Sequence, residues 1–274
     1  MNESKFVIIG GGMAAGYAAK QFVELGLKAG ELTILSGDTH LPYERPPLST
    51  GFLAGRDTEE SIRINSEDFC REHGIEVRLG CRVTSVSPTR KSLSMQISSS
   101  LVIGVQPATE MLTNSGIEVA DGVTVNEYLE TSAPSAFTAG DVANYSDILF
   151  QKRRRVEHWD NAVSQGQYCT RVLMGDRTPF KHVPYFFSHV FDLSYEFWSD
   201  PAGAEETIYR GDLTSNSFSV WWLRQTTVVA VFVINRPDEE RDVAPKWIES
   251  RQVVSAERLA DVSHSVLEAS EISC

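Results

Sequence analysis

The sequence has few cysteines, and their spacing excludes the chemistry that cysteines most often supply. Among 274 residues there are four, Cys70, Cys81, Cys169 and Cys274, and no two of them form a CxxC or CxxxxC pair. A redox-active dithiol within one short loop is therefore excluded. The six histidines never lie at ligand spacing from these cysteines, so we expect no metal site. We interpret the cysteines as free thiols in a reducing compartment.

Positive charge and long apolar stretches are also scarce. The chain carries 25 Lys and Arg against 37 Asp and Glu, a formal net charge of −12, which disfavours non-specific binding to nucleic acid. The basic run 152–155 is interpreted as a solvated surface. The longest purely apolar run beyond the N-terminal glycines, residues 228–234, is far short of the roughly 20 residues that cross a bilayer. The uncharged stretch 6–19 is interrupted by three glycines and is unlike a signal peptide. We expect a cytoplasmic protein that binds neither nucleic acid nor membrane.

The hydrophobic pattern predicts an α/β domain at the N-terminus. Strands at 5–9 and 31–36 flank a helix at 13–25, and such a βαβ unit implies a parallel sheet. Prolines and glycines make residues 38–57 a loop. The predicted elements that follow are a helix near 65–73, strands at 75–79, 82–86 and 101–103, and a helix at 159–174 that Gly175 ends.

The composition changes after Pro179, which predicts a second domain. Aromatic residues cluster between 185 and 198, and the apolar runs 218–223 and 228–234 predict a β-hairpin. An amphipathic helix near 245–251 and a polar tail end the chain. We place the boundary near residue 178, so that a smaller C-terminal α+β domain occupies residues 178–274.

A glycine-rich turn lies between the first strand and the first helix and reads GxGxxA. Glycine permits the tight turn and lets the backbone approach a pyrophosphate, whose charge lies at the helix N-terminus. Asp38 lies 22 residues after Gly16, just past the second strand, where a carboxylate accepts hydrogen bonds from an adenosine ribose. The order of strand, glycine turn, helix and acidic residue favours a dinucleotide site over an ordinary glycine turn. The dinucleotide could be NAD or FAD. The predicted turn residues are Gly10, Gly12, Met13, Ala14 and Ala15.

Further segments resemble a known family. Residues 42–49 (PYERPPLS), 138–143 (TAGDVA) and 156–162 (VEHWDNA) are similar to the FAD-binding blocks of the ferredoxin reductase, monodehydroascorbate reductase and apoptosis-inducing-factor group. This group belongs to the pyridine nucleotide–disulfide oxidoreductase superfamily. Residues 184–193 (PYFFSHVFDL) resemble the start of the group's C-terminal interface domain. The segments occur in the family's order over nearly the whole chain. The resemblance implies a Rossmann-like FAD-binding domain, followed by the smaller C-terminal domain.

The resemblance also implies which residues hold the adenosine half of FAD. Asp38 would bind the adenosine ribose, Arg45 would contact the pyrophosphate, and the backbone at Val83 would border the adenine. A carboxylate and an arginine suit these roles, because charge-assisted hydrogen bonds to hydroxyl and phosphate groups are strong.

A second set of residues is implied at the flavin half. Pro46 would lie near the flavin, and Asp141, which follows Gly140, would accept a hydrogen bond from the ribityl chain. His158 and Trp159 would line the pyrimidine end of the flavin ring, where a helix start favours the negative charge of reduced flavin. The flavin itself would perform the redox chemistry, and His158 is the one candidate for a proton donor beside it.

One part of the family pattern is absent. Family members carry a second Rossmann unit for NAD(P)H between the two FAD segments, and this unit needs its own glycine fingerprint. Residues 81–139 contain three isolated glycines and no such fingerprint. Instead, a Ser-rich linker at 97–100 joins the segments 1–96 and 101–177 of the FAD-binding domain, which together make up residues 1–177.

Two neighbouring features agree with the missing unit. Residues 101–107 resemble the strand with which the family's chain re-enters the FAD domain. Thr50 stands where the family usually has a lysine that meets a glutamate of the NAD(P)H domain. Because an unpaired buried lysine is costly, its loss together with its partner is physically consistent.

Three functions fit these patterns. The first is an FAD-dependent oxidoreductase of ferredoxin reductase type that lacks the NAD(P)H domain and turns over NAD(P)H weakly. It would pass electrons to a small redox protein or a small-molecule acceptor. The second is a non-catalytic FAD-binding redox sensor or interaction module, and the third is an NAD-dependent dehydrogenase that uses the single fingerprint. The electron donor, the acceptor and the oligomeric state, a homodimer included, stay open.

Overall fold

The computed structural model describes residues 4–87, 92–94, 107–190 and 193–270. The chain divides into two compact units, residues 1–181 and 182–274, close to the predicted boundary near 178.

The N-terminal unit is built on a parallel sheet in which β1 pairs with both β2 and β4. The predicted βαβ unit is confirmed, because helix α1 (Met13–Glu24) connects β1 to β2. The strands β4 and β7 also pair in parallel, so the sheet joins the two predicted chain segments. In sheet order the strands are β3 (Glu76–Arg78), β2 (Leu32–Leu35), β1 (Phe6–Ile9), β4 (Ser92–Ser94) and β7 (Ala136–Phe137).

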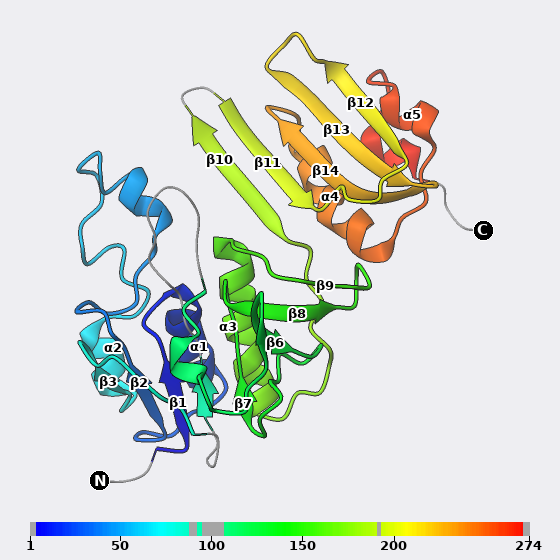
Figure 1. Ribbon diagram of the computed structural model, residues 1–274. Helices are drawn as coiled ribbons and strands as arrows, with labels where there is room; N and C mark the ends of the chain where they lie inside the picture. Colours follow the sequence, from blue (N-terminus) through cyan, green and yellow to red (C-terminus); the bar gives the residue numbers. More distant parts are fainter. Residues whose placement is uncertain (1–3, 88–91, 95–106, 191–192, 271–274) are drawn as a thin grey trace. The chain divides into compact units, whose positions relative to one another are not determined.

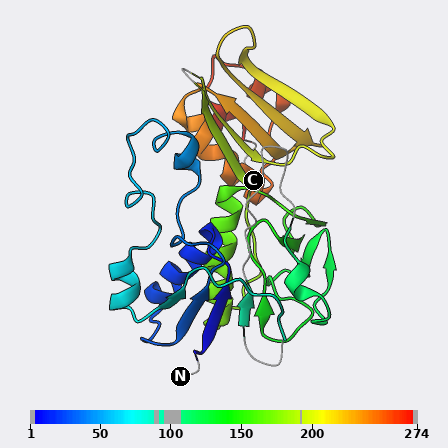
Figure 2. The same cartoon turned by 60° about the vertical axis from the view of Figure 1, so that its left-hand side comes forward.

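Two helices lie side by side on this sheet, α1 and α3 (Trp159–Leu173), as Figures 1 and 2 show. Their backbones approach closely at Gly166 of α3, where an added Cβ would lie 2.4 Å from the Ala14 carbonyl oxygen. Thr170 Oγ1 strengthens the contact by donating to the Ala18 carbonyl at 3.3 Å. The close packing places the N-terminal turns of both helices at the same end of the unit. A short helix, α2 (Glu67–Glu72), covers β3.

A second, four-stranded sheet in this unit was not predicted from the sequence. It contains β5 (Val119–Ala120), β6 (Gly122–Val125), β8 (Ala143–Asp147) and β9 (Lys152–Arg154). Its strands are two to five residues long and lack strong hydrophobic alternation, so their pattern resembles that of turns.

The basic run 152–155 lies on this sheet, and the prediction of a solvated surface holds only in part: Arg153 is exposed, whereas the side chains of Arg154 and Arg155 are 11% and 13% exposed. Arg153 donates to the carbonyls of Val125 and Asn144 at 2.8 and 2.6 Å. Arg154 forms an ion pair with the buried Asp147 at 2.5 Å. These guanidinium groups satisfy the sheet's own polar atoms, because a strand edge presents carbonyls and a buried carboxylate needs a cation.

Two other predicted elements are corrected or untested. Residues 82–86 form no strand: the segment runs past a cavity, and the one backbone hydrogen bond that it makes to another described residue joins Val86 N to the Met111 carbonyl at 3.1 Å. The predicted strand 101–103 and the linker 97–100 lie outside the described residues.

The C-terminal unit is an antiparallel five-stranded sheet with helices on one face. The predicted hairpin is confirmed as β13 and β14, and helix α4 (Asp238–Ser250) packs against β14 and β11. In sheet order the strands are β10 (Tyr185–Val190), β11 (Leu193–Ser199), β14 (Thr227–Ile234), β13 (Ser217–Arg224) and β12 (Glu206–Asp212).

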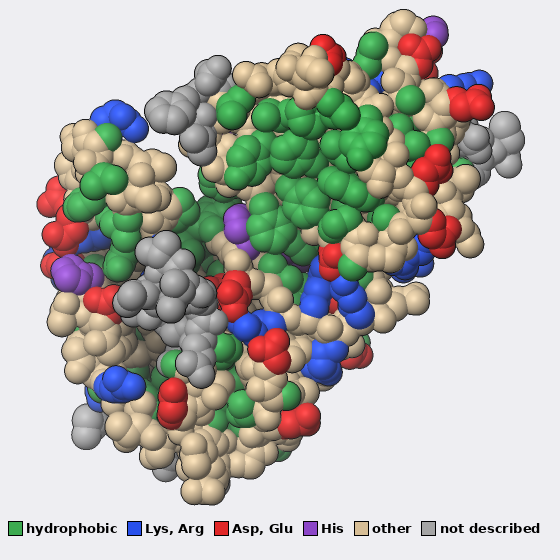
Figure 3. Space-filling view, turned by 45° about the horizontal axis from the view of Figure 1, so that its top comes forward, with side chains coloured by type: hydrophobic (Ala, Val, Ile, Leu, Met, Phe, Trp, Pro, Cys, Tyr) green, Lys and Arg blue, Asp and Glu red, His purple; other side chains and the backbone are tan. Residues whose placement is uncertain are grey.

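The two faces of this sheet differ. On the helix face, Trp221 contacts Trp247 of α4 with ring centroids 5.6 Å apart. On the other face, Phe197 lies 5.9 Å from Trp222 and directly opposite Phe232, and all three are partly exposed. Figure 3 shows the apolar side chains that gather over this unit.

The end of the chain is more ordered than its sequence predicts. Helix α4 begins at Asp238 and not near 245, because three acidic residues occupy its first turn and favour the helix start. The predicted polar tail instead contains α5 (Ala256–Ala260) and the 3₁₀ turn η3 (Val266–Ala269), and buries Leu259 and Val266 completely. Because polar residues separate these few buried apolar residues, the sequence shows no clear hydrophobic periodicity in this segment.

Candidate functional site

The glycine turn after β1 has the geometry of an anion site. Gly10 has a φ of +121°, which side-chain-bearing residues rarely adopt. A Cβ on Gly11 would lie 2.1 Å from Ser36 Oγ, so only glycine lets β2 end this close. Gly12 begins α1 without a capping side chain, and the first turn of α1 has no acidic residue. The N–H groups of this helix start are therefore available to a negatively charged ligand.

A cavity of about 680 Å³ lies beside this turn. Its volume falls in the range that small-molecule and cofactor sites occupy, about 300–1,000 Å³. Residues from the glycine turn, the end of β2, the loop before η1 and the segment 81–84 line it. Five of the predicted cofactor-binding residues are among them, namely Gly10, Gly12, Asp38, Arg45 and Val83.

Asp38 stands at the edge of this cavity as an ionised, preorganised acceptor. The Asp38 backbone N–H donates to Ser36 Oγ at 3.1 Å, and the His40 backbone N–H donates to Asp38 Oδ1 at 3.1 Å. Partial burial alone would raise the pKa of Asp38, but hydrogen bonds from His40 and Thr39 outweigh it and hold the pKa below its usual value. The carboxylate is therefore charged at neutral pH and can accept ribose hydroxyls.

Asp141 is held differently. It follows Gly140, whose φ of +83° and N–H bond of 2.8 Å to Gln165 Oε1 fix the turn. Burial raises the pKa of Asp141 to about 6, and Glu157 adds to the shift while Arg45 opposes it. Among the described residues no donor bonds the Asp141 carboxylate, so this half-buried acceptor is available to a ligand hydroxyl.

His158 and Trp159 begin helix α3. The His158 side chain caps the helix, because its Nδ1 accepts the Asp160 backbone N–H at 3.4 Å, which assigns the ring proton to Nε2. Burial lowers the pKa of His158, so the imidazole is neutral at physiological pH. Trp159 Nε1 donates to Glu44 Oε2 at 2.6 Å.

The remaining predicted residues surround this site without lining the cavity. Met13, Ala14 and Ala15 are buried in the first turn of α1. Pro46 begins the 3₁₀ turn η1 (Pro46–Ser49), which Thr50 ends. Asp141, His158 and Trp159 also lie outside the lining of the cavity. Asp141 is linked to it through its charge interaction with Arg45, and Trp159 through its hydrogen bond to Glu44.

Sequence reasoning missed three supporting side chains, Glu44, Asn161 and Gln165. Asn161 and Gln165 are completely buried in α3, and Asn161 Nδ2 donates to the Val156 carbonyl at 3.0 Å. The side chain of Gln165 accepts the Gly140 backbone N–H and donates to Asn161 Oδ1, and so links Asn161 to the Gly140 turn. The available signal was two amides four residues apart on the apolar face of the predicted helix, since buried amides are kept only where they are hydrogen-bonded.

Metal and disulfide chemistry finds no support in the described part of the chain. No group of three or more His, Cys, Asp or Glu side chains there could hold a metal ion. Cys70, Cys81 and Cys169 are free thiols, and Cys274 lies outside the described residues. Among the helices that the structure describes, none is long and apolar enough to cross a membrane.

Comparison with family models gives a match over each unit. Residues 4–100 and 59–166 match the model of the pyridine nucleotide-disulphide oxidoreductases. Residues 185–269 match the model of a reductase C-terminal domain.

Curated relatives are reductases that are longer than this chain. The ferredoxin reductase subunit of 5,5'-dehydrodivanillate O-demethylase from a Sphingobium species is 29% identical over 269 residues, 94% of this chain and 61% of that protein. Putidaredoxin reductase of Pseudomonas putida is 26% identical over 86% of this chain and 56% of its own length. The chain thus spans about 60% of the length of these relatives.

One alignment locates the missing length inside the chain. Monodehydroascorbate reductase 2 of Arabidopsis thaliana is 22% identical over 425 aligned positions, which cover 93% of this chain and 97% of that protein. Because this chain has 274 residues, an alignment of that length requires large gaps within it.

Solved structures give the same fold. The putidaredoxin reductase chain of a covalent complex with putidaredoxin superposes with a TM-score of 0.86 at 18% identity, covering 98% of both chains. The crystal structure of Fdr9 superposes with a TM-score of 0.83 at 20% identity, over 96% of this chain and 99% of that one.

Proposed function

Since the chain belongs to the pyridine nucleotide-disulphide oxidoreductase family and carries its reductase C-terminal domain, we propose that it holds FAD in its N-terminal unit. It is an oxidoreductase related to ferredoxin and monodehydroascorbate reductases. The proposal extends this relationship to the cofactor and its binding residues.

The observation that carries the proposal is the cavity of about 680 Å³ beside the glycine turn. Gly10 and Gly12, Asp38, Arg45 and Val83 come from four separate stretches of the sequence, and all line it. The glycine turn and Arg45 would hold the pyrophosphate, Asp38 the adenosine ribose, and the backbone at Val83 the adenine edge.

The flavin half would meet residues outside the cavity lining. Asp141 offers a carboxylate that lacks a donor among the described residues, which suits a ribityl hydroxyl. Neutral His158 can donate its Nε2–H, and Trp159 lies next to it at the start of α3. Bound FAD would supply the electron-transfer chemistry, and the protein would supply orientation and electrostatics.

Electrons from NAD(P)H should enter slowly. The second glycine fingerprint is absent from residues 81–139, and the gapped alignment with the Arabidopsis reductase supports a missing internal part. Without a surface that fixes the nicotinamide, hydride transfer becomes effectively bimolecular. We expect flavin reduction by NADH or NADPH to be slow and without saturation, and the acceptor to be a small redox protein or a small molecule.

The experiment is the visible spectrum of the purified protein, followed by chromatography of the cofactor released by heat. A flavin band at about 450 nm and FAD as the dominant released species support the proposal. Released FMN would contradict the adenosine site at Gly10 and Asp38. A colourless protein with bound NAD would point to a dehydrogenase.

A second measurement separates an enzyme from a non-catalytic sensor. Turnover of an artificial electron acceptor is followed with dithionite, NADH or NADPH as the donor. Turnover with dithionite but little with either nucleotide is the expected result. Stopped-flow rates that saturate at micromolar NADH would show that a nicotinamide site exists.

A further inference from the structure

We propose that Glu44 is a positioning residue that fixes the loop of residues 42–47 to the starts of both site helices. The inference rests on the proposed function, because its consequence is the placement of groups around FAD. Glu44 is neither a predicted cofactor contact nor part of the cavity lining.

The Glu44 carboxylate is shared between two helices. Its Oε1 accepts a hydrogen bond from the Tyr17 hydroxyl of α1, and its Oε2 accepts the Trp159 Nε1–H of α3 at 2.6 Å. All three side chains are partly buried. Charge-assisted hydrogen bonds are about twice as strong as neutral ones, so both bonds constrain the loop.

The loop is also held from its other side. The Glu44 backbone N–H donates to the Ile62 carbonyl at 2.8 Å, and the Ile64 N–H donates to the Pro42 carbonyl at 3.0 Å. The backbone of Glu44 is therefore fixed by hydrogen bonds, and its carboxylate contacts two helices from this fixed position. A residue that positions others needs such a fixed backbone.

The neighbours of the three linked residues are the groups that would touch the cofactor. Arg45 follows Glu44, and His158 precedes Trp159. Tyr17 lies one turn beyond Met13 in α1, whose N-terminus adjoins the glycine turn. One carboxylate thus sets the relative positions of a pyrophosphate contact, a helix N-terminus and a flavin contact.

The side chains of Trp159 and Tyr17 both act as donors in their hydrogen bonds to Glu44. An indole N–H can only donate, so Trp159 needs an acceptor at this point. Burial raises the pKa of the Tyr17 hydroxyl, and the Glu44 hydrogen bond and charge add to the effect, so the hydroxyl stays protonated. Glutamine can replace both bonds: its Oε1 accepts from Trp159 while its Nε2–H donates to the Tyr17 oxygen. Alanine replaces neither.

This difference between glutamine and alanine separates positioning from charge. If Glu44 acts by its hydrogen bonds, Glu44→Gln keeps the function and Glu44→Ala loses it. If Glu44 acts through its negative charge near the flavin, both variants lose the function equally.

The test uses the flavin-loaded full chain and its Glu44→Ala, Glu44→Gln, Tyr17→Phe and Trp159→Phe variants. Glu72→Ala is the matched control, since it removes an exposed carboxylate of α2. The FAD dissociation rate is measured from the recovery of free-flavin fluorescence after dilution. The visible circular dichroism of the bound flavin reports its orientation.

We expect Glu44→Ala to release FAD about tenfold faster or more, because two charge-assisted hydrogen bonds are lost, and to change the flavin dichroism. Glu44→Gln and Glu72→Ala should stay within about threefold of wild type. Tyr17→Phe should add nothing in the Glu44→Ala background, because the bond is already gone. Should Glu44→Ala fail to fold, Tyr17→Phe and Trp159→Phe still remove one bond each and should accelerate release singly.

Two results would overturn the inference while leaving the proposed function intact. Glu44→Gln matching Glu44→Ala would assign the effect to charge, and wild-type behaviour of every variant would remove Glu44 from the site. A wild-type protein that never binds FAD would instead overturn the proposed function.

Discussion

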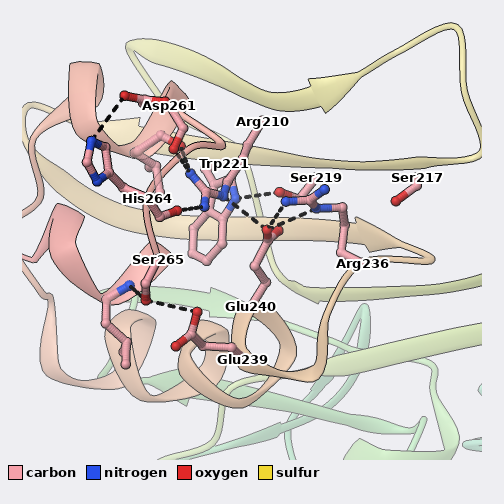
Figure 4. A network of polar contacts seen from close by, with 12 residues as sticks. Arg210, Ser217, Ser219, Trp221, Arg236, Glu239, Glu240, Asp261, His264 and Ser265 are labelled. Atoms are coloured by element: carbon pink, nitrogen blue, oxygen red, sulfur yellow. Dashed lines mark hydrogen bonds and ion pairs between the residues drawn. The ribbon is translucent and has the colours of Figure 1, made fainter.

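A buried ion pair of the C-terminal unit and a half-buried carboxylate of the N-terminal unit are held differently. In the C-terminal unit, Arg210 and Glu240 have side chains only 3% exposed and pair at 3.0 Å (Figure 4). Arg210 also donates to the carbonyls of Leu259, Asp261 and His264 at 2.5–3.0 Å. In the N-terminal unit, Asp141 has no donor among the described residues, and α1 begins without a capping side chain.

This difference indicates what each unit is built for. Buried polar groups are normally hydrogen-bonded, and a half-buried carboxylate to which no described residue donates is a candidate ligand contact. Arg210 donates to carbonyls of α5 and of the segment that follows it, so its network serves folding. Under the proposed function, FAD is the ligand that completes Asp141 and the glycine turn.

Removing Arg210 should damage the C-terminal unit severely. Arg210→Ala leaves Glu240 with Arg236 as its one remaining partner in the described chain, and frees three carbonyls that hold the last segments. Breaking one partner from a buried ion pair costs about 3–5 kcal/mol. Chemical denaturation should show this loss, and Lys246→Ala, an exposed residue of α4, should show almost none. A loss below about 1 kcal/mol would mean that the network is not structural.

Substitutions at Asp141 should separate binding from stability. Asp141→Ala removes a charge-assisted hydrogen bond to the ligand, so FAD should bind about 1.5–3 kcal/mol more weakly. Titration of the apoprotein with FAD measures this loss. Equal affinity in the variant and in wild type would rule out a direct role for Asp141.

The apoprotein should respond to Asp141→Asn in the opposite sense. Burial raises the pKa of Asp141 from 3.8 to about 6, so the folded apoprotein holds a proton that the unfolded chain has already released. The favourable contribution of this proton is complete below pH 3.8 and is lost as the pH rises through about 6. The neutral amide avoids that loss and should stabilise the apoprotein at pH 7 by on the order of 2 kcal/mol. Thermal unfolding at pH 7 and at pH 4 should show the gain at pH 7 alone.

The same pKa predicts how FAD retention depends on pH. A ribityl hydroxyl donates to the ionised carboxylate, so affinity should be highest above pH 6 and fall as Asp141 becomes protonated below it. Dissociation constants measured between pH 4.5 and 8, within the range where the fold persists, test this. Asp141→Asn should flatten the profile across about pH 6.

The smallest expected effect concerns His158. His158→Ala removes the side-chain cap of α3, whose bond is long at 3.4 Å. Loss of a cap costs about 0.5–2 kcal/mol, and a long bond belongs at the lower end. Since the imidazole is neutral at physiological pH, turnover with an artificial acceptor should fall only slightly. A large loss of turnover at unchanged FAD affinity would instead assign His158 a proton-transfer role.

Much of the fold of both units could be predicted from the sequence. The βαβ unit was predictable because the glycines at 10–12 separate an apolar strand from an apolar helix, and a second apolar strand follows that helix. The hairpin β13–β14 was predictable because its strands are long and apolar. Both patterns are local, so they survive without knowledge of the fold.

The rest depends on contacts distant in the sequence. Glu44 reaches Trp159 across 115 positions, and Arg153 bonds Val125 across 28. Composition classed the whole run 152–155 as solvated, because a basic run carries no sign of the buried carboxylate that Arg154 meets after folding. The tail 252–270 looked polar because its buried apolar residues, such as Leu259 and Val266, are too few to give a helical hydrophobic pattern.

Proton release on FAD binding tests the contrast between the units most directly. At pH 6 about half of Asp141 is protonated in the apoprotein, and a ligand that needs the ionised carboxylate must displace that fraction. Calorimetric titrations with FAD in buffers of different ionisation enthalpy give the number of protons released. We predict that wild type releases about half a proton more than Asp141→Asn at pH 6, and that the difference vanishes at pH 8. Equal release from both proteins at pH 6 would contradict the assignment of Asp141 as the acceptor that FAD completes.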